Sequence, residues 1–163
     1  MDTEPPEPES PPSADAPTAS KLLFLQERMV NFTQQYSMPV VEVSLVLSKY
    51  TKQISTHLSA HAAEQGEELP ERLSQPWPLE SDDPAADVAL DTEFALDKVL
   101  DMVDADRIDI FDTIIRNVIN ECELPLTDAL LFMREWEHLV RSQLAGASGP
   151  GSLFSPVEYP DDF

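Results

Sequence analysis

The chain has 163 residues with 31 acidic and 10 basic side chains, which give a formal net charge of −21. This charge opposes binding to nucleic-acid phosphates, which attract clustered Lys and Arg, and the sequence has no run of the roughly 18 apolar residues that span a bilayer. We therefore expect one domain with tails that neither binds nucleic acid directly nor inserts into a membrane.

Cysteine content and the N-terminal sequence predict a cytoplasmic protein. Cys122 is the only cysteine, so the chain can form neither an internal disulfide nor a thiolate metal cluster. Residues 1–20 contain no Lys, no Arg and no apolar block, which a secretory signal or an Arg-rich transit peptide would need. A reducing, intracellular compartment fits this composition.

The N-terminal tail is predicted to be disordered. Residues 1–20 are rich in Pro, Glu and Ser and almost lack large apolar side chains. Such a segment cannot bury enough apolar surface to offset the entropy that it loses on ordering.

Two near-neutral helices are predicted over residues 21–64. Residues 21–36 carry an apolar stripe at spacings of three and four, formed by Leu22, Leu25, Met29, Phe32 and Tyr36, and Ser20 is the expected N-cap. Residues 38–64 begin with an alternating Val and Leu pattern that is also typical of a strand, but the helical spacing persists too long for an ordinary strand. Ser37 is the expected N-cap of this second helix.

Residues 65–82 are expected to form a linker, because they contain three prolines and a glycine. Trp77 lies between two of these prolines and is the one large aromatic side chain in the segment. It is interpreted as an anchor that packs back onto the bundle, with an exposed contact to a partner as the alternative.

Three acidic helices over residues 83–145 are expected to pack with the first two. They span about 84–103, 107–122 and 128–144, with N-caps at Asp83, Asp106 and Thr127. In the second of these helices, Ile110 and Ile114 widen the apolar stripe until more than half of the girth is apolar. Such a surplus is commonly covered by a partner or a second copy.

The C-terminal segment, residues 146–163, is expected to be a flexible tail. It is acidic and contains Phe154, Tyr159 and Phe163, a composition typical of a docking peptide. A tail that folds back onto the bundle explains the same residues, and the sequence leaves both alternatives open.

Five aspartates lie between Asp101 and Asp112, and a divalent-metal enzyme built on this cluster is one alternative function. A calcium loop that starts at Asp104 would need Gly at its sixth position, where the sequence has Asp109. Helix capping and the helix dipole explain aspartates near a helix start more simply.

The sequence shows no catalytic constellation. His57 and His61 share a helical face but lack the Glu that the zinc-protease motif places after its first His. Cys122 lies on an apolar stripe, where a thiol is expected to be inert. No Gly-rich phosphate loop is present. We therefore predict no enzyme, no bound cofactor and no metal site.

These patterns predict an all-α bundle of about five helices with disordered ends. The favoured function is that of a non-enzymatic adaptor or chaperone-like assembly protein, which binds a basic protein partner through an apolar helical groove. A homodimer is a second way to cover the surplus apolar surface, and a regulator that mimics nucleic acid toward a basic partner is an alternative. The residues expected to contact a partner are Trp77, Ile110, Ile114, Phe154, Tyr159 and Phe163.

Overall fold

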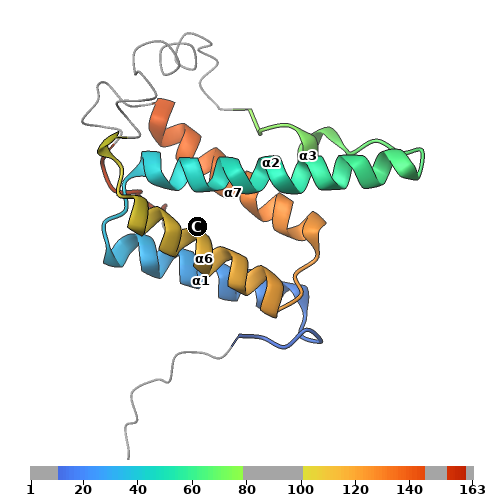
Figure 1. Ribbon diagram of the computed structural model, residues 1–163, viewed down its shortest axis with the longest axis horizontal. Coiled ribbons are helices and arrows are strands. Elements are labelled where there is room, and N and C mark those ends of the chain that lie inside the picture. The colour runs from blue at the N-terminus through green and yellow to red at the C-terminus, as the bar shows by residue number, and fades with distance from the viewer. Residues whose placement is uncertain (1–10, 79–100, 146–153, 161–163) are drawn as a thin grey trace, which may run out of the picture.

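The structure, a computed structural model, describes residues 11–78, 101–145 and 154–160. This part of the chain contains five helices and no β-strand, which confirms the predicted all-α bundle (Figure 1). The helices are α1 (Thr18–Gln35), α2 (Val40–Glu64), the single turn α3 (Glu71–Ser74), α6 (Ala105–Glu121) and α7 (Leu126–Ala145).

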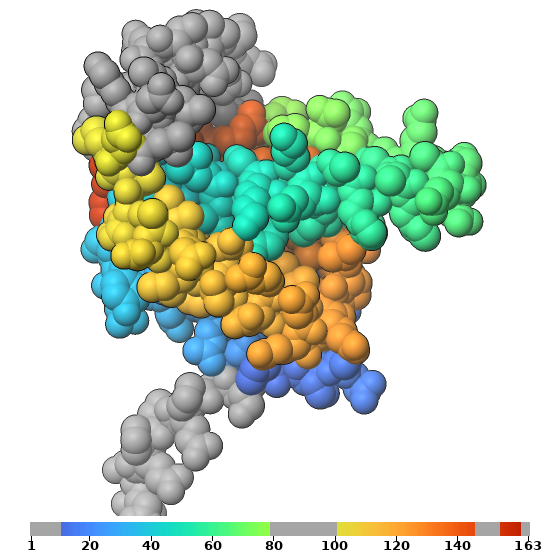
Figure 2. Space-filling view, in the orientation of Figure 1, coloured from blue at the N-terminus to red at the C-terminus, as the bar shows by residue number. Residues whose placement is uncertain are grey.

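Two pairs of helices make up the bundle. α1 and α6 lie side by side and antiparallel, and α2 packs chiefly against α7, which crosses it at an angle (Figure 1). Figure 2 shows α6 lying across the front of the molecule between α2 and α1, with its outer face open along most of its length.

One hydrophobic core joins the four long helices. The helical interpretation of residues 38–64 is confirmed, because the side chains of α2 that follow the helical spacing are buried. Tyr36, the last member of the predicted α1 stripe, is an exception and is 51% exposed. The fully buried large side chains include Leu25, Met29, Leu47, Phe111, Ile115, Met133 and Trp136.

The start of α6 explains the first part of the aspartate cluster. Asp104 is the N-cap residue, and its side chain accepts hydrogen bonds from the backbone N–H groups of Asp106 (3.0 Å) and Arg107 (3.1 Å). These bonds satisfy two of the donors that a first helical turn leaves unpaired. The prediction that Asp106 caps this helix is therefore wrong, and the helix begins at Ala105.

The prediction that Ser37 caps α2 is also wrong. Ser37 has a positive φ of 46°, and the N-cap position belongs to Pro39, whose side chain makes no capping hydrogen bond. The first N–H of the helix, that of Val40, donates instead to the carbonyl oxygen of Ser155 at 2.9 Å. A distant segment thus provides the cap that sequence reasoning assigned to a local side chain.

The other two long helices begin earlier than predicted. α1 begins at Thr18 with Pro17 at the N-cap, and the N–H of Ser20 donates to the Pro17 carbonyl oxygen at 3.0 Å. α7 begins at Leu126, so Thr127 lies inside its first turn. A proline precedes each of these first helical residues, and its fixed φ is compatible with a helix start, but its side chain has no acceptor for a capping hydrogen bond.

Two buried carboxylates bind α6 to α2. Glu42 is fully buried and accepts bonds from the Arg107 guanidinium, with Nε–Oε1 and Nη2–Oε2 distances of 2.6 Å each. These bonds raise the pKa of Arg107. About two turns further along α2, Lys49 Nζ (2.6 Å) and the Tyr50 hydroxyl donate to the carboxylate of Asp112 in α6. The position of α6 is therefore set by polar pairs as well as by apolar packing.

The predicted linker holds Trp77 against α7. The Trp77 indole N–H donates to the carbonyl oxygen of Arg72 (2.9 Å), and Arg141 of α7 donates to the Trp77 carbonyl oxygen (2.7 Å). Arg134 of α7 donates to the carbonyl oxygen of Leu73 in the short helix α3 (3.0 Å). Trp77 is partly buried by these contacts, as the anchor interpretation predicted.

Several predictions fall outside the described residues. These are residues 1–10 of the N-terminal tail, almost all of the helix predicted over 84–103, and residues 146–153 and 161–163 of the C-terminal tail. In the ranges that the structure does describe, none of the helices has the length and apolar character needed to cross a membrane.

Candidate functional site

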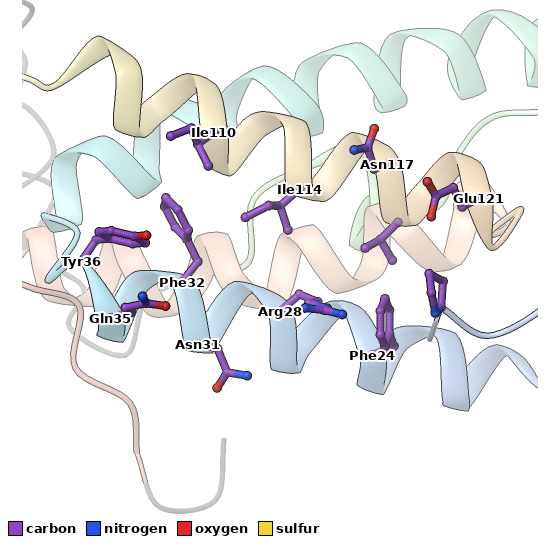
Figure 3. Close-up of a pocket in the computed structure, with 12 residues that line it drawn as sticks. Phe24, Arg28, Asn31, Phe32, Gln35, Tyr36, Ile110, Ile114, Asn117 and Glu121 are labelled. Carbon is purple, nitrogen blue, oxygen red and sulfur yellow. The ribbon is translucent and has the colours of Figure 1, made fainter. Parts of the chain in front are cut away.

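The candidate site is a groove between α1 and α6 on the described surface. It has a volume of about 450 Å³ and is bordered by side chains from both helices (Figure 3). Pro11, which lies before α1, contributes to its border as well. Apolar side chains form its floor, and polar groups stand mainly at its rims.

The α1 side of the groove follows one helical face. Phe24, Arg28 and Phe32 recur every four residues, so they lie above one another along the helix. Phe24 and Phe32 are buried to 6% and 8% exposure and form the floor, whereas Tyr36 continues the row and is half exposed. The Phe32 and Tyr36 ring centroids are 4.9 Å apart, which extends the aromatic surface from the core to the solvent.

The α6 side presents the facing row. Ile110, Ile114 and Val118 recur every four residues, and Figure 3 shows the Ile114 side chain pointing across the groove toward α1. Ile110 is 52% exposed, and Ile114 is half-buried. A second row on the same helix, which includes Phe111 and Ile115, fills the core. α6 therefore has one apolar row for the core and a second that reaches the solvent.

The two ends of the groove differ in polarity. Tyr36, Phe32 and Ile110 form an apolar end. At the other end, the Arg28 guanidinium lies 4.9 Å from the Phe24 ring centroid, and Glu121 borders the groove from α6. The groove is therefore apolar at one end and charged at the other.

The six residues predicted to contact a partner do not form one site. Ile110 and Ile114 line the groove, whereas Trp77 lies against α3 and α7. Tyr159 contacts Thr33 and Trp136, so it packs on the bundle, and Phe154 is partly buried. Phe163 lies outside the described residues. For residues 154–160, the structure thus favours the tail that folds back.

Sequence reasoning missed the α1 half of the groove. Phe24 was not part of the predicted stripe, and Tyr36 was assigned to the core. The spacing of Phe24, Arg28 and Phe32 by four residues is a signal that could have revealed a second face on this helix. Nothing in the sequence indicates that this face meets the row of Ile110 and Ile114, because that depends on how the two helices pack.

The aspartate cluster does not converge on one point in the described structure. Asp104 caps α6, and Asp112 is held in the pair with Lys49 and Tyr50. Burial opposes the charged form of Asp112, but the hydrogen bonds from Lys49 and Tyr50 outweigh it and lower the pKa of this carboxyl. Within residues 11–78, 101–145 and 154–160, no three His, Cys, Asp or Glu side chains lie close enough together to hold a metal ion.

The nucleophile that the sequence offers lies in the core. Cys122 is fully buried at the end of α6, and burial raises the pKa of its thiol. A protonated, buried thiol is a poor nucleophile. The groove itself carries amides, an arginine and a glutamate among apolar side chains, a set suited to binding.

Comparison with known proteins supplies no analogy for this groove. No protein family, curated protein or solved structure matches the chain significantly.

Proposed function

We propose that this chain is a non-enzymatic helical interaction protein, an adaptor or chaperone-like assembly factor. Its α1/α6 groove would bind the apolar face of a helix in a partner protein. The observation that carries this proposal is the second apolar row of α6, in which Ile110 is half exposed beside the equally exposed Tyr36. Two large apolar side chains that border one concave surface are a common feature of helix-in-groove recognition.

The chemistry of the partner follows from charge. The net charge of −21 attracts a basic partner over distances of about a Debye length, roughly 8–10 Å at physiological salt. Exposed acidic side chains on and next to α6, among them Asp106, Asp109 and Glu121, bring part of this charge close to the groove. We expect a partner helix with apolar residues at spacings of three and four, flanked by Lys or Arg.

Site-specific photo-crosslinking tests this proposal. Tyr36 is replaced by the similarly shaped benzoylphenylalanine, and the protein is irradiated in native extract. We expect a discrete crosslinked partner that is lost when the substitution Ile110→Asp is added, because the new carboxylate would have to be desolvated in an apolar contact. Mass spectrometry of the adduct then identifies the bound segment.

Two controls match the exposure of the probed residues. The same crosslinker at Leu23, which is 59% exposed on α1 but does not line the groove, should not capture the partner. Met102→Asp makes the same charge change as Ile110→Asp at a residue that is 64% exposed outside the groove, and should leave the crosslink intact. Equal capture from positions 23 and 36, or equal loss with both aspartates, would contradict the proposal.

A regulator that mimics nucleic acid is the second candidate function, and the excess of acidic side chains favours it. In that case DNA would compete for the crosslinked partner, and crosslinking would fall steeply with salt. An adaptor that binds mainly through the apolar groove would keep its capture in the presence of DNA, and salt would weaken the capture only moderately, by screening the flanking charges.

A further inference from the structure

The C-terminal strap, residues 154–160, binds the bundle through its backbone. The Val40 N–H donates to the Ser155 carbonyl oxygen (2.9 Å), and the Val157 N–H donates to the Met38 carbonyl oxygen (3.4 Å). Between these bonds, Pro39 and Pro156 face each other as an antiparallel bridge. In an antiparallel pair, some facing residues exchange no backbone hydrogen bonds with each other. Pro39 and Pro156 occupy such a position, which prolines can fill because they have no N–H to donate.

The Gln143 side chain of α7 binds the backbone of Glu158 in the strap. Gln143 Oε1 accepts a hydrogen bond from the Glu158 N–H (3.1 Å), and Gln143 Nε2 donates to the Glu158 carbonyl oxygen. One amide side chain thus pairs with both polar backbone groups of a residue, as a neighbouring strand would. The Glu158 side chain takes no part in these bonds, and Glu158 is exposed.

The side chains of the strap alternate as in an extended peptide. Val157 is 8% exposed, and Tyr159 lies with its ring centroid 5.5 Å from that of Trp136 in an edge-on contact. The Tyr159 hydroxyl is hydrogen-bonded to the hydroxyl of Thr33. Residues 157 and 159 therefore face the bundle, and residue 158 faces the solvent, which is the period of two of a bound strand.

We propose that the surface under the strap is a recognition site for an extended peptide of a partner protein, with the pattern Pro, β-branched residue, any residue, Tyr. In this structure, the chain's own C-terminal strap occupies the site. The contacts of the strap show which peptide the site would accept. The bundle binds backbone groups of the strap and two of its inward-facing side chains, as do proteins that bind a peptide as an added strand. This site is separate from the α1/α6 groove, and the proposal does not depend on the groove.

The strap is suited to be displaced. It is held by one bridge, by Gln143 and by two inward side chains, so it can detach without unfolding a helix. The segment 146–153, which joins it to α7, contains three of the four glycines of the chain. Because these eight residues tether the strap covalently to α7, the effective concentration of the strap at its site is on the order of millimolar, so a partner peptide must outcompete the strap or bind after it is removed.

The test uses the full chain and a synthetic peptide with the sequence of residues 153–160, labelled for fluorescence anisotropy. In an opened variant, Val157→Asp with Tyr159→Ala removes both inward side chains of the strap. We expect the peptide to bind the opened variant at least about 10-fold more tightly than the wild type, in which the strap competes. A peptide that carries the same two substitutions should not bind.

A third substitution tests whether the peptide binds at the surface under the strap. Adding Gln143→Ala to the opened variant removes the amide that pairs with the peptide backbone and should weaken binding about 5-fold or more. Absence of peptide binding to an opened variant that retains its helical circular dichroism would overturn the proposal. Concentration-dependent dimers of the wild type that are lost in the opened variant would overturn it too, because a second copy's strap would then be the natural occupant.

Hydrogen exchange in the wild type keeps the proposal testable if the opened variant fails to fold. A displaceable strap predicts that the Val40 amide exchanges well before the core amides of α2, since it loses its acceptor whenever the strap opens. Exchange of Val40 only with global unfolding would show that the strap is an integral part of the fold and would refute its displacement.

Discussion

Replacing Arg107 by alanine should destabilise the fold strongly, because it leaves the Glu42 carboxylate buried without its cation. The Glu42 side chain is 1% exposed, and it receives two guanidinium bonds of 2.6 Å. After the substitution, Glu42 would still accept the backbone N–H of Asp104, at 3.3 Å, which is a neutral donor.

The magnitude follows from these contacts. Removing one partner of a buried ion pair costs about 3–5 kcal/mol. Because the Arg107 side chain is itself 26% exposed, water can enter the vacated space, so we expect the lower end, about 3 kcal/mol. With a urea dependence of about 2 kcal/mol per molar, this shifts the unfolding midpoint by about 1.5 M.

Urea unfolding followed by circular dichroism measures this change, and two further variants control for it. Replacing both partners by methionine should restore stability to within about 1 kcal/mol, because no buried charge remains unpaired. Arg116→Ala removes an exposed arginine from the same helix and should cost no more than about 0.5 kcal/mol. A cost below about 1 kcal/mol for Arg107→Ala, or a double variant as unstable as the single one, would refute the reasoning.

The remaining predictions concern pH. The pKa of Asp112 is lower in the folded state than its ordinary value of 3.8. Ionised Asp112 therefore stabilises the fold fully above pH 3.8, and this contribution is lost as the pH falls through the pKa of the folded state. Urea midpoints of Asp112→Asn should therefore fall less toward acid than those of the wild type, and parallel curves would argue against the Lys49 and Tyr50 bonds as the cause. Burial raises the pKa of Tyr159 to about 12, so its contribution is present below pH 10 and is lost as the pH rises from 10 to 12. Exchange of the Val40 amide, measured relative to core amides, should become faster in this range in the wild type but not in Tyr159→Phe, and the same acceleration in both would exclude Tyr159 as the titrating group.

Much of the fold could be predicted from periodicity. The stripes of residues 38–64, 107–122 and 128–144 gave helices with nearly correct bounds, because a face that repeats every 3.6 residues can be buried only as a helix. The caps were harder to predict. Asp104 and Asp106 are both suitable N-cap residues, and the choice between them depends on where the chain arrives relative to Glu42, which accepts the Asp104 N–H.

The candidate site could be predicted only in part. The surplus apolar residues Ile110 and Ile114 were recognised, since a stripe wider than half a helix must reach beyond one neighbour. Their partners across the groove, Phe24 and Tyr36, could not be identified, because an apolar residue on a second face is equally consistent with core packing. Burial at such positions depends on the crossing of α1 and α6, which a single sequence does not encode locally.

The sequence by itself determined the helical class, the excess of acidic groups and most of the residues that fill the core, because these properties depend on composition and on spacing within one segment. The tertiary structure decided which apolar rows close on each other, which carboxylates are paired, and that residues 154–160 cap α2 and cover Trp136. Those outcomes depend on contacts between residues far apart in the chain, and a backbone N–H or a half-buried ring finds its partner only when the helices have packed.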